Sequence, residues 1–236
     1  MSFKKNLLLS LLLASTFTCS FAQKKTKKDQ LVTIETSEGV MHLVLFDQTP
    51  LHKANFLKLV DKKFYDDLLF HRVIDDFMIQ GGDPDSKQAP AGTLLGKGDI
   101  GYTIPAEFSA ALFHQKGALA AARNDNPEKA SSGCQFYLVQ GRKWTATELE
   151  FQQTRAARPF TEQQKTIYQN IGGTPHLDGS YTVFGQVIDG LAVIDRIAAL
   201  PTGQRDRPEK NIAMKISSKK MSKRKIHRKY GYNYSN

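Results

Sequence analysis

The stretch FHRVIDDFMIQGGD, residues 70–83, contains two short apolar runs separated by a pair of aspartates. Such runs are typical of strands, in which side chains two positions apart share a face. Arg72 therefore lies among apolar neighbours in the first run, and Gln80 shares a face with Met78 in the second. By itself this pattern favours an ordinary hairpin with a solvated arginine, because single exposed charges are common on protein surfaces.

Other segments extend this strand pattern over most of the chain. Apolar alternation or short apolar runs predict strands at 31–36, 40–46, 68–74, 77–80, 118–122, 135–139, 182–188 and 212–216. Only two regular helices are expected, one that opens at Thr49-Pro50 and one over 191–199. Many short strands with few helices indicate a mainly β fold, either a closed antiparallel β-barrel or a sandwich.

Residues 142–174 interrupt this pattern because they are polar and lack strand alternation. The segments Thr145-Ala146-Thr147-Glu148 and Thr161-Glu162-Gln163-Gln164 both match the capping box that begins a helix. The segment has too few apolar residues to fill a core of its own. We interpret it as a short helical insertion in a surface connection of one domain that covers residues 30–218.

The positive charge of the chain is concentrated at its two ends. The whole sequence has 33 basic and 23 acidic residues. Thirteen of the basic residues precede residue 29 or follow residue 218, so the segment between carries about −3. Residues 23–29 form a basic stub, and residues 219–236 form a basic tail that is expected to be disordered because it has no acidic residues and few apolar ones.

The N-terminus has the pattern of an export signal. Lys4 and Lys5 precede an apolar run, and Ser20-Phe21-Ala22 offers small residues at a cleavage point, so residues 1–22 are interpreted as a signal peptide. A retained membrane anchor is disfavoured by the short apolar run. We expect a periplasmic protein, with lipid anchoring through Cys19 or secretion as alternatives. Without Cys19, Cys134 has no cysteine partner and is interpreted as a small buried hydrophobe.

The stretch 70–83 resembles the signature of the cyclophilin family of peptidyl-prolyl cis-trans isomerases almost residue for residue. The resemblance continues, in family order, in 117–123, 132–137 and 177–185, and it spans residues 30–217 apart from the insertion. It implies an eight-stranded antiparallel β-barrel that is closed and capped by two α-helices, with the substrate in a groove outside the barrel. We therefore expect a bacterial exported form of this family that carries the helical insertion.

The resemblance also assigns the site. It implies that Arg72 is the catalytic arginine and that Gln80 holds the substrate carbonyl. The substrate-binding residues that it implies are Phe77, Met78, Ala122, Arg123, Gln135, Phe136, Tyr137, His176, Leu177 and Tyr181. No metal or cofactor is expected. The expected partners are proline-containing polypeptides bound by a monomer; nucleic acid is not expected, and weak contact of the tail with an anionic membrane is an option.

These residue types suit the reaction that the family catalyses. Rotation about an Xaa–Pro bond breaks amide resonance, and the twisted proline nitrogen regains a lone pair to which a guanidinium can donate. Three positions depart from the commonest eukaryotic pattern: His176 replaces a tryptophan, Tyr137 a phenylalanine and Tyr181 a histidine. These departures leave Arg72 and Gln80 in place but weaken the expectation of tight immunosuppressant binding. A non-catalytic proline-peptide binding module or chaperone is the alternative.

Overall fold

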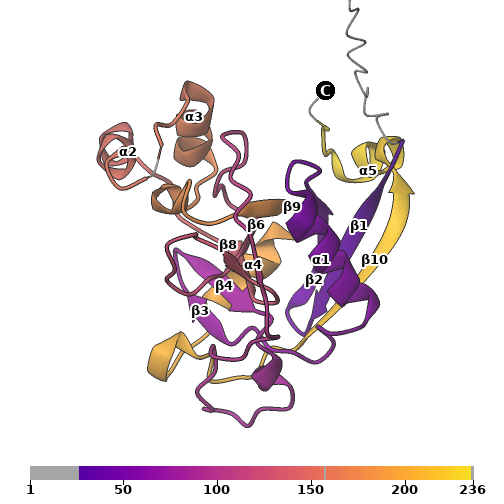
Figure 1. Cartoon of the computed structure of the whole chain (residues 1–236). Coiled ribbons are helices and arrows are strands. Elements are labelled where there is room, and N and C mark those ends of the chain that lie inside the picture. The colour runs from indigo at the N-terminus through magenta and orange to yellow at the C-terminus, as the bar shows by residue number, and fades with distance from the viewer. Residues whose placement is uncertain (1–26, 157, 235–236) are drawn as a thin grey trace, which may run out of the picture.

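The computed structural model describes residues 27–156 and 158–234, which form two antiparallel sheets and five α-helices (Figure 1). The strands of the larger sheet are β1 (Lys28–Thr36), β2 (Gly39–Leu45), β3 (Arg72–Ile74), β4 (Met78–Gly81), β6 (Ala118–Ala121), β8 (Phe136–Val139), β9 (Val183–Asp189) and β10 (Met214–Ser222). The small sheet pairs β5 (Thr103–Ile104) with β7 (Ser131–Ser132). The helices are α1 (Pro50–Asp61), α2 (Ala146–Gln153), α3 (Glu162–Asn170), α4 (Leu191–Ala198) and α5 (Lys223–Tyr230).

The larger sheet has the strand order β10-β1-β2-β9-β6-β8-β4-β3. Each of the eight predicted strands is present with shifted bounds, so the mainly β prediction is confirmed. Among the described residues, β10 and β3 do not pair with each other as strands, although an isolated bridge joins Leu69 to Ala213 just before them. The Phe70 amide also donates to the Ile212 carbonyl at 2.9 Å. A barrel closed by continuous strand pairing stays a prediction.

The main core is formed by the sheet together with α1 and α4, the two predicted helices. Helix α4 buries Val193, Ile194 and Ile197, which the 3.6-residue repeat places on one face. Helix α1 contributes Phe56, whose ring contacts those of Tyr65, Phe136 and Phe184 at centroid distances of 5.1 to 5.6 Å. The edge-on and tilted geometry of these rings is the favoured one for aromatic pairs.

The insertion 142–174 contains the two expected helices, α2 and α3. Both capping boxes are formed, with Thr145 and Glu148 at α2 and Thr161 and Gln164 at α3. The insertion also has a small apolar cluster, which was not predicted; it is built from the buried side chains of Leu149, Phe160 and Tyr168. The two helices lie at the side of the molecule away from α5 (Figure 1).

The prediction that residues 219–236 are disordered is wrong for the described part of this segment. Strand β10 continues to Ser222, which pairs with Lys28 at the start of β1. The last two residues of the predicted basic stub 23–29, Lys28 and Asp29, therefore belong to the sheet. Helix α5 follows at once, and its Ile226 is fully buried against Leu31 and Val44. The tail folds because tertiary contact supplies the apolar surface that its own sequence lacks.

The remaining predictions for the N-terminus lie outside the described residues, namely the signal peptide at 1–22 and the lipid attachment at Cys19. None of the helices in 27–156 and 158–234 has the length and apolar character needed to cross a membrane.

Candidate active site

Antiparallel pairing brings four site positions into one row across four strands. Arg72 on β3 lies opposite Gln80 on β4, Gln80 lies opposite Tyr137 on β8, and Tyr137 lies opposite Ala120 on β6. Directly opposed residues of an antiparallel sheet point to the same face. The register therefore places the arginine, the glutamine and the tyrosine side by side on one surface of the sheet.

A pocket of about 160 Å³ opens on this surface. Its lining consists of nine residues, all among those predicted: Arg72, Phe77, Met78, Gln80, Ala122, Arg123, Tyr137, Leu177 and Tyr181. Most of these side chains are apolar or aromatic, and the polar ones are few. Such a lining suits a small apolar ring held by a limited number of hydrogen bonds.

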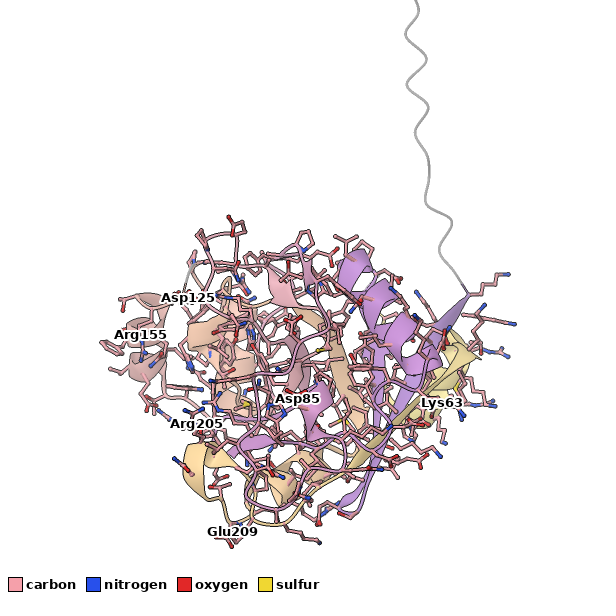
Figure 2. All side chains as sticks on the ribbon, turned by 60° about the horizontal axis from the view of Figure 1, so that its bottom comes forward. Lys63, Asp85, Asp125, Arg155, Arg205 and Glu209 are labelled. Carbon is pink, nitrogen blue, oxygen red and sulfur yellow. The ribbon has the colours of Figure 1, made fainter. Side chains whose placement is uncertain are left out.

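The two polar side chains at the centre of the row have defined partners. Arg72 donates from Nε to Oδ2 of Asp206 at 3.3 Å, and both side chains remain nearly half exposed. Asp206 belongs to the short helix η3 (Gln204–Asp206), in which the neighbouring residue Arg205 is labelled in Figure 2. Gln80 donates from Nε2 to Oε1 of Gln135 at 3.0 Å. Because the contact to Asp206 uses only Nε, the terminal nitrogens of Arg72 are left for a ligand.

Gln135 does not line the pocket itself but fixes the glutamine that does. Its Nε2 donates to the carbonyls of Gly96 and Gly98 at 3.2 and 2.9 Å, so its Oε1 is oriented toward Gln80. Gln135 also borders an adjoining hollow with Ala122 and Arg123. Within the pocket Gln135 supports Gln80 through this hydrogen bond, and its predicted contact with substrate stays a prediction.

Arg123 and Tyr181 form one edge of the pocket. The guanidinium of Arg123 lies 4.8 Å from the ring centroid of Tyr181 and donates from Nε to the carbonyl of Ser180 at 3.1 Å. The ring of Tyr181 meets that of Tyr137 edge-on at 6.0 Å. A cation over an aromatic face is attracted by the ring quadrupole, which holds this edge together.

Phe136 and His176 were both predicted as substrate-binding and neither lines the pocket. Phe136 is a correction: its side chain lies in the main core, because successive residues of a strand point to opposite faces and its neighbour Tyr137 occupies the pocket face. His176 stacks on the pocket residue Phe77 at a centroid distance of 5.7 Å. Burial lowers the pKa of His176 below its usual value.

Two further ionisable groups near the site are kept neutral by burial. Burial lowers the pKa of His71 to about 4, so this neighbour of Arg72 is uncharged at neutral pH. Burial raises the pKa of the Cys134 thiol to about 11, in line with the predicted inert, buried cysteine. In the described part of the chain, no three His, Cys, Asp or Glu side chains converge as a metal site would require.

A family model described as cyclophilin type peptidyl-prolyl cis-trans isomerase/CLD matches residues 31–219, which is most of the chain. The chain belongs to the cyclophilin family. The match includes the four strands that carry the row from Arg72 to Ala120 and the insertion that follows them in the chain. The pocket on these strands is therefore the candidate active site of a cyclophilin.

Curated relatives agree with this family. A bifunctional phosphatase/peptidyl-prolyl cis-trans isomerase of Streptococcus pyogenes serotype M6 is 41% identical over 185 residues, which are 77% of this chain and 37% of that protein. This chain thus spans little more than a third of that relative's length. A peptidyl-prolyl cis-trans isomerase of Staphylococcus haemolyticus is 37% identical over 184 residues, covering 78% of this chain and 87% of that protein.

Solved structures share the fold of this cyclophilin. A cyclophilin type peptidyl-prolyl cis-trans isomerase of Cryptosporidium parvum superimposes with a TM-score of 0.59 at 23% identity, covering 81% of this chain and 98% of that one. A crystal structure of the same protein in the presence of the dipeptide Ala-Pro gives a TM-score of 0.57 at 23% identity and covers 79% of this chain and 97% of that one.

Sequence reasoning missed two partners of the site residues. Asp206, which holds Arg72, lies 134 positions away in a segment without a strand or helix pattern. His114, whose Nε2 is hydrogen-bonded to the hydroxyl of Tyr137, lies 23 positions before that tyrosine. The need of Tyr137 for a partner could be inferred, since a buried hydroxyl is rarely left unpaired, but the sequence does not say which residue provides it.

Proposed function

We propose that this cyclophilin accelerates rotation about Xaa–Pro bonds and that Arg72 donates a hydrogen bond to the proline nitrogen of the twisted amide. The observation that carries the proposal is the row in which Arg72, Gln80 and Tyr137 share one face at an apolar pocket. The planar amide nitrogen is a poor acceptor, and the twisted nitrogen has a lone pair. A donor placed at this position therefore binds the transition state better than the ground state.

The size of this effect limits what Arg72 can do alone. A hydrogen bond that involves a charged group contributes roughly 1.5–3 kcal/mol net, which corresponds to about ten- to hundredfold in rate. The barrier to rotation is about 18–20 kcal/mol. We infer that the remainder comes from orientation: the pocket holds the proline ring, and Gln80, itself fixed by Gln135, binds the substrate carbonyl.

The proposed substrates are proline-containing segments of exported or unfolded polypeptides, whose folding the protein would assist. The size and apolar lining of the pocket support a proline ring as the recognised group. The signal-like pattern of residues 1–22 supports export, with the periplasm as the proposed location. The N-terminal mass of the mature protein tests this part, since cleavage before Gln23 and lipidation at Cys19 give different masses.

An exchange assay on an Xaa-Pro peptide tests the role of Arg72. We expect Arg72→Ala to lower kcat/KM by about ten- to hundredfold with little loss of stability, since the Arg72–Asp206 pair is nearly half exposed. Arg196→Ala is the matched control, because Arg196 donates to the Glu38 carbonyl in the turn between β1 and β2, does not line the pocket, and should leave kcat/KM unchanged. Equal rates for wild type and Arg72→Ala would overturn the proposed role.

The alternative of a non-catalytic binding module predicts a different result in the same assay. In that case the peptide binds and shifts the resonances of pocket residues, but its isomerisation is not accelerated by wild type. Acceleration by wild type excludes this alternative as the sole function.

We also propose that the basic C-terminal region contacts anionic membrane lipid. Helix α5 and the adjoining strand ends carry exposed cations on one region of the surface: Lys27, Lys28, Lys219, Lys220, Arg224, Lys225, Arg228 and Lys229. Each basic residue near an anionic bilayer contributes about 1 kcal/mol, and salt screens the attraction. Sedimentation with phosphatidylglycerol vesicles should decrease with salt and in Arg224→Glu/Arg228→Glu. Binding to neutral vesicles at equal strength would contradict it.

A further inference from the structure

A buried polar network extends from the pocket to the helical insertion. Nε2 of His114 lies 3.0 Å from the hydroxyl of Tyr137, and Nδ1 of His114 lies 2.8 Å from Oδ1 of Asp178. The hydroxyl of Tyr168, on α3 of the insertion, lies 2.8 Å from Oδ2 of the same aspartate. These four side chains, Tyr137, His114, Asp178 and Tyr168, are called the relay below.

The direction of each hydrogen bond in the relay follows from its chemistry. A carboxylate can only accept, so both Nδ1 of His114 and the hydroxyl of Tyr168 donate to Asp178. In the tautomer that carries its hydrogen on Nδ1, the Nε2 atom of His114 is the acceptor for the hydroxyl of Tyr137. Burial raises the pKa of Tyr137 and of Tyr168 well above the usual range, so both hydroxyls keep their hydrogen.

Burial makes the relay specific. His114 is 1% exposed, and Asp178 and Tyr168 are fully buried. Each unmade hydrogen bond would leave a buried polar group without water, so the four side chains have one satisfied arrangement. In that arrangement the hydroxyl of Tyr137 is bonded to buried His114, and its ring stacks on the imidazole of His114 with 13° between the planes.

Asp178 fixes a second part of the pocket in addition to Tyr137. It follows directly after the short helix η2 (Pro175–Leu177), which carries the pocket residue Leu177. Its Oδ1 also accepts from the backbone amide of His114 at 2.9 Å, and Arg158 of the insertion lies 3.6 Å from Oδ2. Two residues of the pocket lining, Tyr137 and Leu177, are therefore positioned by the single carboxylate of Asp178. Tyr168 and Arg158 of the insertion contact this carboxylate.

We propose that the insertion positions the proline pocket through the relay, with Tyr168 as a positioning residue that acts on Tyr137 by way of Asp178 and His114. The inference rests on the proposed function only in that the pocket binds proline. Helix α3 of the insertion thus provides Tyr168, at one end of a hydrogen-bonded chain whose other end is the pocket residue Tyr137.

A double-mutant cycle tests the relay. Tyr168→Phe removes the hydroxyl that donates to Asp178. It should weaken binding of an Xaa-Pro peptide and lower kcat/KM by roughly two- to tenfold. The change should be mainly in KM, because the pocket residue Tyr137 contacts the ground state and the transition state alike. In the Tyr137→Phe background, where the relay no longer ends on the pocket residue, the same change should have an effect of less than about twofold. Both peptide affinity and kcat/KM are measured for each of the four proteins.

Trp144→Phe is the matched control, because Trp144 packs against the same apolar cluster as Tyr168 and donates from Nε1 to the Gly173 carbonyl at 2.8 Å, whereas its side chain has no hydrogen bond to the carboxylate of Asp178 among the described residues. It should leave peptide affinity unchanged. An equal loss in Trp144→Phe, or the same loss for Tyr168→Phe in both backgrounds, would show that the insertion acts only through general stability and would overturn the relay. Wild type that binds peptide without acceleration would overturn the proposed function, while the affinity cycle would still decide the relay.

Discussion

The sheet has two apolar clusters outside the main core, of which one borders the pocket and the other is covered by α5. The pocket cluster comprises the buried side chains of Met78, Ala118, Ala120, Tyr137, Val139 and Val183. The tail cluster comprises Leu31, Val44 and Ile226. Phe46 packs against both, so they are neighbouring parts of one surface. The pocket cluster is left open, whereas α5 and the tyrosines that follow it cover the tail cluster.

The difference shows how one surface can serve binding at one end and stability at the other. Exposed apolar area is costly in water, so the chain's own C-terminal helix closes one patch. At the other patch, Leu177 and the Arg123–Tyr181 edge surround the opening without filling it. Asp125, Arg155 and Arg205 lie on the side of the molecule away from Lys63 and α5 (Figure 2).

Breaking the tail cluster should give the largest effect. Ile226→Asp places a charge at a fully buried position and should lower the free energy of unfolding by about 4 kcal/mol, measured by urea denaturation. kcat/KM should change by less than about twofold, because α5 does not line the pocket. The control is His227→Asp, the exposed next position of the same helix. A parallel tenfold loss of kcat/KM in Ile226→Asp would show that the two ends are coupled.

Lowering the pH should reduce the stability of the folded protein through His71. This side chain lies near the pocket, is buried and faces the charges of Asp83, Arg207 and Arg72. Its pKa is about 4 in the folded state against 6.5 when unfolded, so the unfolded state binds the proton first. The associated stability is fully present above pH 6.5 and is lost as pH falls toward 4, on the order of 3 kcal/mol.

Urea denaturation at pH 7 and pH 4.5 compares wild type with His71→Leu. We expect the stability of the variant to fall less steeply between these two pH values, because the group that gains the proton on unfolding is gone. Identical slopes for the two proteins would exclude His71 as the source.

The smallest effect is expected at the ion pair that orients Arg72. Asp206→Asn keeps the shape of the side chain and removes its charge. Since the pair is nearly half exposed and involves only Nε, we expect kcat/KM to fall by about two- to threefold. Asp125→Asn, which removes the exposed partner of Arg123, is the control. A rise in kcat/KM for Asp206→Asn would show that Asp206 competes with substrate instead of orienting the arginine.

Most of the fold and most of the pocket could be predicted because their signals are local. Strand alternation around Val32 and the capping boxes at Thr145 and Thr161 involve neighbours in sequence. The stretch 70–83 and the blocks that accompany it identified nine residues that line the pocket. Phe136 was assigned to the pocket wrongly because the family pattern marks a segment, whereas the pleat decides which of two adjacent side chains faces it.

By itself, the sequence predicted the strands of the larger sheet, the helices α1 to α4 and, through the family resemblance, the site residues that include Arg72 and Gln80. Only the tertiary structure decided that α5 folds, that Asp206 holds Arg72 and that Tyr137 donates to His114. The physical reason is the distance along the chain. Periodicity and caps act within one or two turns, but the partner of a buried or charged group is set by the packing of elements far apart in the sequence, such as Arg72 and Asp206, which are separated by 134 positions.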